Sequence, residues 1–189
     1  MPVDGEMPGD DEGDAFDDRL ARAQRGEPRA FDELVRWLER PLLGFLTARG
    51  AEDPHGTANE VLVRVFRRID RFAGGQAQFR AWVFKIARNA LVDEHRRRAS
   101  RPIAVPNGTE ALTGAVAAGD DLDRIGERER VEAMLGCLTD DQREVVLLRV
   151  VAGLSVAETA RTVGRRPGAV RALQHRALAR LRASLSGSA

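Results

Sequence analysis

The chain has 189 residues, which suits one or two small domains, and a hydrophobic fraction of 43%, which is enough for a buried core. It has no long apolar run, so a membrane span and a secretory signal are excluded, and its single cysteine excludes a disulfide scaffold or a cysteine-based zinc site within the chain. A reducing cytoplasm is therefore the expected compartment.

The net charge of +1 conceals an uneven distribution. Residues 1–18 hold eight acids and no base, whereas the rest of the chain holds 30 bases against 21 acids, and 29 of those bases are arginine. Arginine forks suit phosphates and guanine edges better than lysine does, although a genome rich in G and C would favour arginine codons equally.

The acidic stretch at residues 1–18 contains glycine and almost no large apolar side chain. Such a composition predicts a disordered leader. Two interpretations of it stay open: the leader could screen a basic surface until a partner arrives, or it could only improve solubility.

Apolar residues recur at helical spacing over residues 28–49, where Pro41 is expected to bend or break the helix. A second helix is predicted over residues 53–69, because an Asp-Pro pair begins it with a capping residue followed by a proline at the first helical position. A loop over residues 70–78 follows, with Phe72 and two adjacent glycines.

The next predicted helix, over residues 79–98, is strongly patterned. One side is apolar, and the opposite side carries Arg80, Lys85, Arg88, Asn89 and Arg96. Aromatic rings interleaved with arginines suit single-stranded nucleic acid, on which bases stack and phosphates pair. The alternatives are that Trp82 belongs to the core and that the basic C-terminal end only complements the helix dipole.

Residues 102–126 lack periodicity and are predicted to form a flexible linker. Helical spacing resumes at Arg128, and Cys137 is expected to line the core beside Leu135 and Leu138. Since no strand pattern stands out, the sequence predicts an all-α protein of two small helical domains.

Residues 138–182 predict three short helices. Thr139 with Gln142, and Ser155 with Glu158, form two capping-box patterns. Gly164 is placed to end the second helix, and a proline at residue 167 suits the start of the third. The spacing between the last two helices is that of a helix-turn-helix.

The third of these helices has an apolar stripe through Val170, Ala177 and Leu181 and a basic remainder. Residues 143–182 hold nine arginines against two acids. This pattern is typical of a helix that reads the DNA major groove. A helical hairpin with a solvated basic face is the alternative.

The segment FRAWVFKIARNALVDEHRRR, residues 79–98, resembles the promoter-melting, minus-ten-reading segment of bacterial sigma factors. Residues 138–182 resemble their minus-thirty-five-reading domain. Because no middle domain separates the two, the chain is similar to the small extracytoplasmic-function (ECF) group. The resemblance implies four parts: a leader at 1–18, region 2 at 19–101, a linker at 102–126 and region 4, a helix-turn-helix, at 127–189.

The resemblance also implies roles for individual residues. The minus-thirty-five element would meet Arg165, Arg166, Arg171, His175 and Arg176. The minus-ten element would meet Phe72, Arg80, Lys85, Arg88 and Asn89, with the loop capturing a base flipped from the non-template strand. Core polymerase would contact Asn59, Glu60 and Arg64.

The sequence departs from the family pattern in several places. In the polymerase-binding helix, His55, Gly56 and Asn59 replace residues that are commonly acids or glutamine. In the reading helix, Arg166 stands where a serine cap is common, and Ala172-Leu173 where serine and arginine are common. Core contact and base preference are therefore expected to differ from the usual ones.

The implied function is that of a sigma factor that binds core RNA polymerase, recognises promoter DNA and initiates transcription. It would be no enzyme, would need no cofactor or metal, and would not itself contact a membrane. Family members are often bound by an anti-sigma factor, and the sequence leaves open whether this chain has such a partner. The acidic linker would pass through the RNA exit path of the polymerase.

Three alternatives remain. A helix-turn-helix regulator acting without polymerase would explain the C-terminal half but not residues 79–98. A nucleic-acid enzyme lacks support, because no phosphate-binding loop or metal-ligand spacing is present. A pure interaction adaptor would use the basic domains for protein contact alone.

Overall fold

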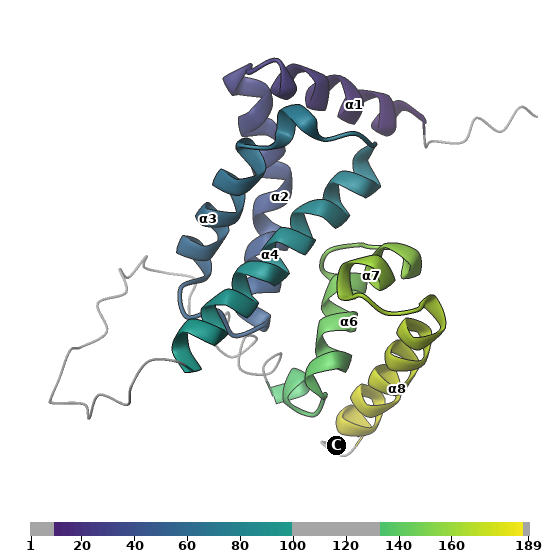
Figure 1. The fold of residues 1–189 in the computed structure, drawn as a ribbon. Helices are drawn as coiled ribbons and strands as arrows, with labels where there is room; N and C mark the ends of the chain where they lie inside the picture. The colour runs from purple at the N-terminus through teal and green to yellow at the C-terminus, as the bar shows by residue number, and fades with distance from the viewer. Residues whose placement is uncertain (1–9, 100–132, 187–189) are drawn as a thin grey trace, which may run out of the picture.

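The computed structural model describes residues 10–99 and 133–186, and all regular secondary structure within these ranges is helical (Figure 1). The N-terminal domain consists of α1 (Asp10–Gln24), α2 (Pro28–Ala48), α3 (Pro54–Phe66), the short 3-10 helix η1 (Ile69–Arg71) and α4 (Gln76–Ala99). The C-terminal domain contains α6 (Asp140–Val150), α7 (Val156–Val163) and α8 (Pro167–Ser186). The prediction of an all-α protein with two helical domains is confirmed.

Helix α1 corrects the prediction that residues 1–18 are a disordered leader. Residues 10–18 form the first part of α1, and Phe16, Leu20 and Ala23 are buried against the rest of the domain. Three apolar residues at helical spacing provide enough contact to order a segment that its acidic composition marks as unfolded. Residues 1–9 lie outside the described part of the chain.

Helix α2 runs unbroken through Pro41, although the sequence predicts a bend or break there. A proline removes one backbone hydrogen bond of the helix. Leu38, Leu42 and Phe45 on either side of Pro41 are fully buried, and this packing holds the helix together. Helix α3 is shorter than predicted, since it ends at Phe66 and the chain then turns into η1.

The C-terminal domain begins its helices where the capping patterns predict. Thr139 and Ser155 each accept from the backbone three residues on, and Gln142 and Glu158 reach back, so both capping boxes are complete. Gly164 has φ +68°, the left-handed conformation that glycine adopts without strain at a helix end. A small core inside this domain consists of Val145, Ala160, Val170 and Leu173.

Cys137 does not line the core as predicted. Its side chain is exposed, and Sγ donates to the carbonyl oxygen of Met134 at 3.0 Å. A single helical turn spans residues 133–136. Leu135 within it and Leu138 just after it are three residues apart, lie on the same side and are buried. Cys137 falls on the opposite side.

The two domains pack against each other. Helix α7 lies beside α4, and α6 lies beside α2, as Figure 1 shows. Leu147, Leu148 and Leu154 of the C-terminal domain belong to the same buried cluster as Phe45 and Phe84 of the N-terminal domain. The domains thus share one hydrophobic core; the predicted linker at 102–126 lies outside the described residues.

Within the described ranges, none of the helices is both long enough and apolar enough to cross a membrane.

Candidate nucleic-acid and polymerase interfaces

The loop between η1 and α4 carries Phe72, one of the predicted minus-ten residues. Its ring is half-buried: it stacks on Trp82 with ring centres 5.1 Å apart and meets the edge of Phe79 at 5.3 Å. Phe72 therefore anchors the loop to the domain. Trp82 is partly buried in the same cluster, as its core interpretation requires.

Two other predicted minus-ten residues, Lys85 and Asn89, are exposed on α4. They are four residues apart, so they lie on one face of the helix. An ammonium group and a side-chain amide on the same open face can pair with a phosphate and with a base edge.

The remaining two, Arg80 and Arg88, face the C-terminal domain. Arg88 Nε donates to Glu144 Oε1 at 2.9 Å, and the Glu144 side chain is only 10% exposed. The guanidinium of Arg80 lies 4.5 Å from the centre of the Trp37 ring. Burial lowers the pKa of Arg80 from its usual value, and the carboxylate of Glu158 acts in the opposite direction.

Glu144 is the centre of the polar contact between the domains. Besides Arg88, its carboxylate meets Arg49 at 4.0 Å, and Arg49 also donates to the carbonyl oxygen of Asp140 at 3.4 Å. A carboxylate shared by two arginines is well compensated despite its burial. In this arrangement, a carboxylate of the C-terminal domain pairs with Arg88, one of the arginines of α4 that the sequence assigns to DNA.

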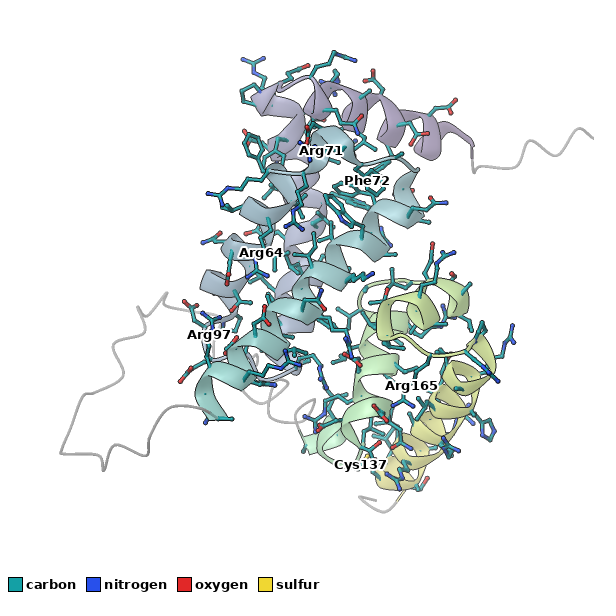
Figure 2. The ribbon with its side chains drawn as sticks, in the orientation of Figure 1. Arg64, Arg71, Phe72, Arg97, Cys137 and Arg165 are labelled. Atoms are coloured by element: carbon teal, nitrogen blue, oxygen red, sulfur yellow. The ribbon has the colours of Figure 1, made fainter. Side chains whose placement is uncertain are left out.

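The predicted minus-thirty-five residues all lie on the outer surface of the helix-turn-helix. Arg171, His175 and Arg176 project from α8, and Arg165 and Arg166 stand in the turn before it. Arg165 pairs with the exposed carboxylate of Asp141 at 2.7 Å (Figure 2).

The opposite side of α8 is the apolar stripe. Val170, Leu173 and Ala177 are buried, and Leu181 is half-buried. Leu173 occupies one of the two positions where the family commonly has polar residues. Because it contributes to the small core of this domain, it is unavailable to DNA in this structure.

The predicted polymerase-binding residues lie on α3. Asn59 is exposed, and Glu60 pairs with Arg64 at 2.6 Å, one helical turn further on (Figure 2). Val63 and Phe66 are 48% and 55% exposed, so two large apolar side chains one turn apart on α3 are open to solvent.

Sequence reasoning missed Val63 and Phe66. They follow Asn59 by four and seven residues, so the three lie on one helical face outside the buried stripe of α3. That spacing could have identified them. The edge of the Phe66 ring meets Phe31 with ring centres 4.9 Å apart, which extends the apolar surface to α2.

A second group that sequence reasoning missed is the arginine cluster beside the loop. Arg67 and Arg68 lie between α3 and η1, and Arg71 is the last residue of η1; all three are exposed. The Arg71 side chain, labelled in Figure 2, is 89% exposed. The run RRIDR directly before Phe72 was the available signal. These cations can meet phosphates of a strand that enters the loop.

Two sequence-family models match the chain in the order of its two domains. Residues 30–101 match Sigma-70 region 2, and residues 128–181 match Sigma-70, region 4. The two regions together define a sigma factor of the sigma-70 type.

Curated relatives refine the class. The ECF RNA polymerase sigma factor SigD of Mycobacterium tuberculosis is 33% identical, and the alignment covers 90% of this chain and 84% of SigD. ShbA of Streptomyces griseus, of the same class, is 31% identical over 92% of this chain and 97% of ShbA. BldN of Streptomyces coelicolor is 31% identical over 84% of this chain, which spans only 61% of BldN.

Solved structures agree with these matches. CnrH, in complex with the cytosolic domain of CnrY, has a TM-score of 0.68 at 27% identity, over 93% of this chain and 99% of CnrH. RpoE of Bartonella quintana, in complex with the anti-sigma factor NepR, shares the fold with a TM-score of 0.60 at 22% identity, over 82% of this chain and 96% of RpoE.

This chain therefore belongs to the ECF RNA polymerase sigma factors. The family resemblance is confirmed, and so is the predicted function: the chain is a sigma factor, which initiates transcription together with core RNA polymerase.

Proposed function

We propose that the two domains divide promoter recognition between them, with residues 19–101 binding core polymerase and the minus-ten element and residues 127–189 binding the minus-thirty-five element. The observation that carries this proposal is the polarity of α8. Its apolar stripe is buried in the C-terminal domain, and Arg171 and Arg176 project outward from it as the second helix of the helix-turn-helix. That is the geometry in which a helix enters the major groove.

Within region 4, Arg171 and His175 occupy consecutive turns of α8 on the exposed side. A guanidinium can fork onto a guanine edge, whereas Arg165, paired with Asp141 in the turn, is better suited to a phosphate contact.

Replacing Arg171 by alanine is expected to weaken promoter binding by roughly 1–3 kcal/mol, the usual value of one good base contact. Affinity for core polymerase should stay unchanged, because the substitution is remote from α3. Electrophoretic mobility shift with holoenzyme measures the first quantity, and fluorescence titration of core polymerase measures the second. Equal loss of both affinities would indicate misfolding, and unchanged promoter affinity would contradict the assignment.

For core polymerase we propose a mixed surface on α3. Asn59, Glu60 and Arg64 provide polar contacts, and the exposed Val63 and Phe66 provide apolar area. Large apolar side chains that stay exposed beside charged neighbours are typical of a protein-binding patch.

For the minus-ten element we propose Lys85 and Asn89 together with the loop that carries Phe72. We include Arg80 and Arg88 as well, but they face the C-terminal domain: Arg88 pairs with Glu144, and the carboxylate of Glu158 acts on Arg80. They can reach DNA only after the two domains separate. Opening is thus part of the proposed function.

The chain would supply binding energy rather than bond chemistry, since contacts to exposed bases offset the cost of opening the duplex. No group of side chains that could hold a metal ion is present among the described residues. Its place of action would be the cytoplasm, where core polymerase and promoter DNA meet. An anti-sigma partner, of the kind bound to RpoE, is included in the proposal.

Run-off transcription tests the division of labour. The wild-type chain with core polymerase should produce a defined transcript. Changing either promoter element alone should abolish that transcript. The competing proposal, a regulator that acts without polymerase, requires tight operator binding by the chain alone and no transcript. A footprint from the chain alone at nanomolar concentration would favour that competitor.

A further inference from the structure

The last residue of α1 holds the loop that precedes α4. The side-chain amide of Gln24 donates to the carbonyl oxygens of Ile69 at 2.9 Å and Phe72 at 2.7 Å. These two carbonyls belong to the first residue of η1 and to the residue directly after η1. One side chain therefore bridges a turn that lies 45 to 48 residues further along the chain.

The loop is fixed at several points by other contacts. The backbone amide of Phe72 donates to Ile69 at 3.1 Å, and the Phe72 ring stacks on Trp82. On the far side, the amide of Phe79 donates to Gly75 at 2.9 Å as α4 begins. Between these points, Ala73 and Gly74 are exposed, and Gly74 has φ +141°. These contacts hold both ends of the loop, and its tip, Ala73 and Gly74, faces solvent.

Gln24 is itself held in place by the packing of α1 on α2. Leu20, one turn before it, and the adjacent Ala23 are buried, and Arg19 and Arg22 pair with Glu33 of α2 at 3.1 and 3.4 Å. The amide thus reaches the loop from a rigid helix. Two hydrogen bonds from one preorganised group order a turn at low entropic cost before any ligand binds.

We propose that Gln24 is a positioning residue for base capture: it sets the conformation of the loop that receives the flipped minus-ten base. This inference rests on the proposed minus-ten function. Gln24 touches no DNA base in the proposal and acts through the carbonyls of Ile69 and Phe72. Without it, the loop must be ordered at the moment of capture, which lowers affinity and blunts base discrimination.

The test compares Gln24→Met and Gln24→Glu with the exposed neighbour variant Arg25→Ala as control. Methionine keeps the length and helix propensity of glutamine but cannot donate, and glutamate presents oxygen to two carbonyls. Each holoenzyme is titrated with single-stranded non-template oligonucleotides of the minus-ten element that carry each of the four bases at the captured position. Core affinity and the unfolding midpoint are measured alongside.

Both Gln24 variants are expected to bind the preferred oligonucleotide roughly ten- to a hundredfold more weakly, the loss from two hydrogen bonds, with reduced preference among the four bases. Initiation should recover on a template already open at the minus-ten element, and core affinity should match that of Arg25→Ala, whereas the unfolding midpoint should fall by no more than the loss of these two intramolecular hydrogen bonds explains. Retained base preference would overturn the inference, as would a parallel loss of core affinity. If the wild-type holoenzyme itself shows no preference, the proposed minus-ten function fails and the inference fails with it.

Discussion

A disulfide between Gly44→Cys in α2 and Val151→Cys after α6 is expected to stop transcription for as long as it stays oxidised. A Cβ atom added to Gly44 would lie 3.4 Å from Val151 Cγ1, so the two cysteines fall within bonding reach across the domain interface. The bond would keep the two domains packed together, in the arrangement in which Arg88 is paired with Glu144.

The expected loss is at least about a hundredfold in open-complex formation, because apparent affinity falls with the fraction of molecules in the competent arrangement. The exposed Cys137 must first be replaced by serine, since its thiol would compete for the bond. Oxidised protein is mixed with core polymerase and promoter DNA, and transcript is quantified before and after adding reductant.

The two single-cysteine variants, oxidised in parallel, control for thiol chemistry at each position. They should transcribe as the Cys137→Ser protein does, and the double variant should regain that level on reduction. Full activity of the oxidised double variant would show that the domains need not part, and the proposed role of Arg80 and Arg88 would then be wrong.

Replacing Phe16 by alanine is expected to destabilise the protein by about 3–5 kcal/mol, the usual cost of deleting a buried aromatic side chain. Phe16 is 1% exposed, and its ring lies 5.2 Å from that of Trp37 and 5.6 Å from that of Phe79. The cavity would open beside the cluster that anchors Phe72. Urea denaturation monitored by tryptophan fluorescence measures the change.

The neighbouring Asp17→Ala, at an exposed position of the same helix, is the matched control and should alter the free energy of unfolding by less than about 0.5 kcal/mol. Removing residues 1–18 should reproduce the loss seen for Phe16→Ala, because it removes the same ring. If the truncated protein were as stable as the wild type, the packing of α1 would not contribute to the free energy of unfolding, and the prediction of a disordered leader at residues 1–18 would be favoured again.

Local signals predicted the C-terminal domain well. The Thr139 and Ser155 capping boxes fixed two helix starts, and Gly164 fixed an end, because caps are satisfied by residues three or four positions away. The apolar periodicity of α8 also separated its buried side from its basic side. Such features depend on near neighbours, which a sequence displays directly.

Long-range features were not predictable in the same way. The acidic composition of residues 1–18 concealed α1, because the burial of Phe16 depends on Trp37 and Phe79 far along the chain. The pairing of Arg88 with Glu144 joins residues 56 positions apart and depends on how the domains pack. The sequence indicated Arg88 as a DNA contact but could not show that Arg88 pairs with the carboxylate of Glu144.

The central claim is that this chain, through its two basic helical domains, starts RNA synthesis at promoters that it selects. The most direct measurement is transcription of a fragmented genomic library by purified core polymerase with and without the chain, followed by sequencing of the RNA 5′ ends. The account predicts new start sites preceded by two shared sequence elements at fixed spacing. A set of start sites identical to that of core polymerase alone would contradict it.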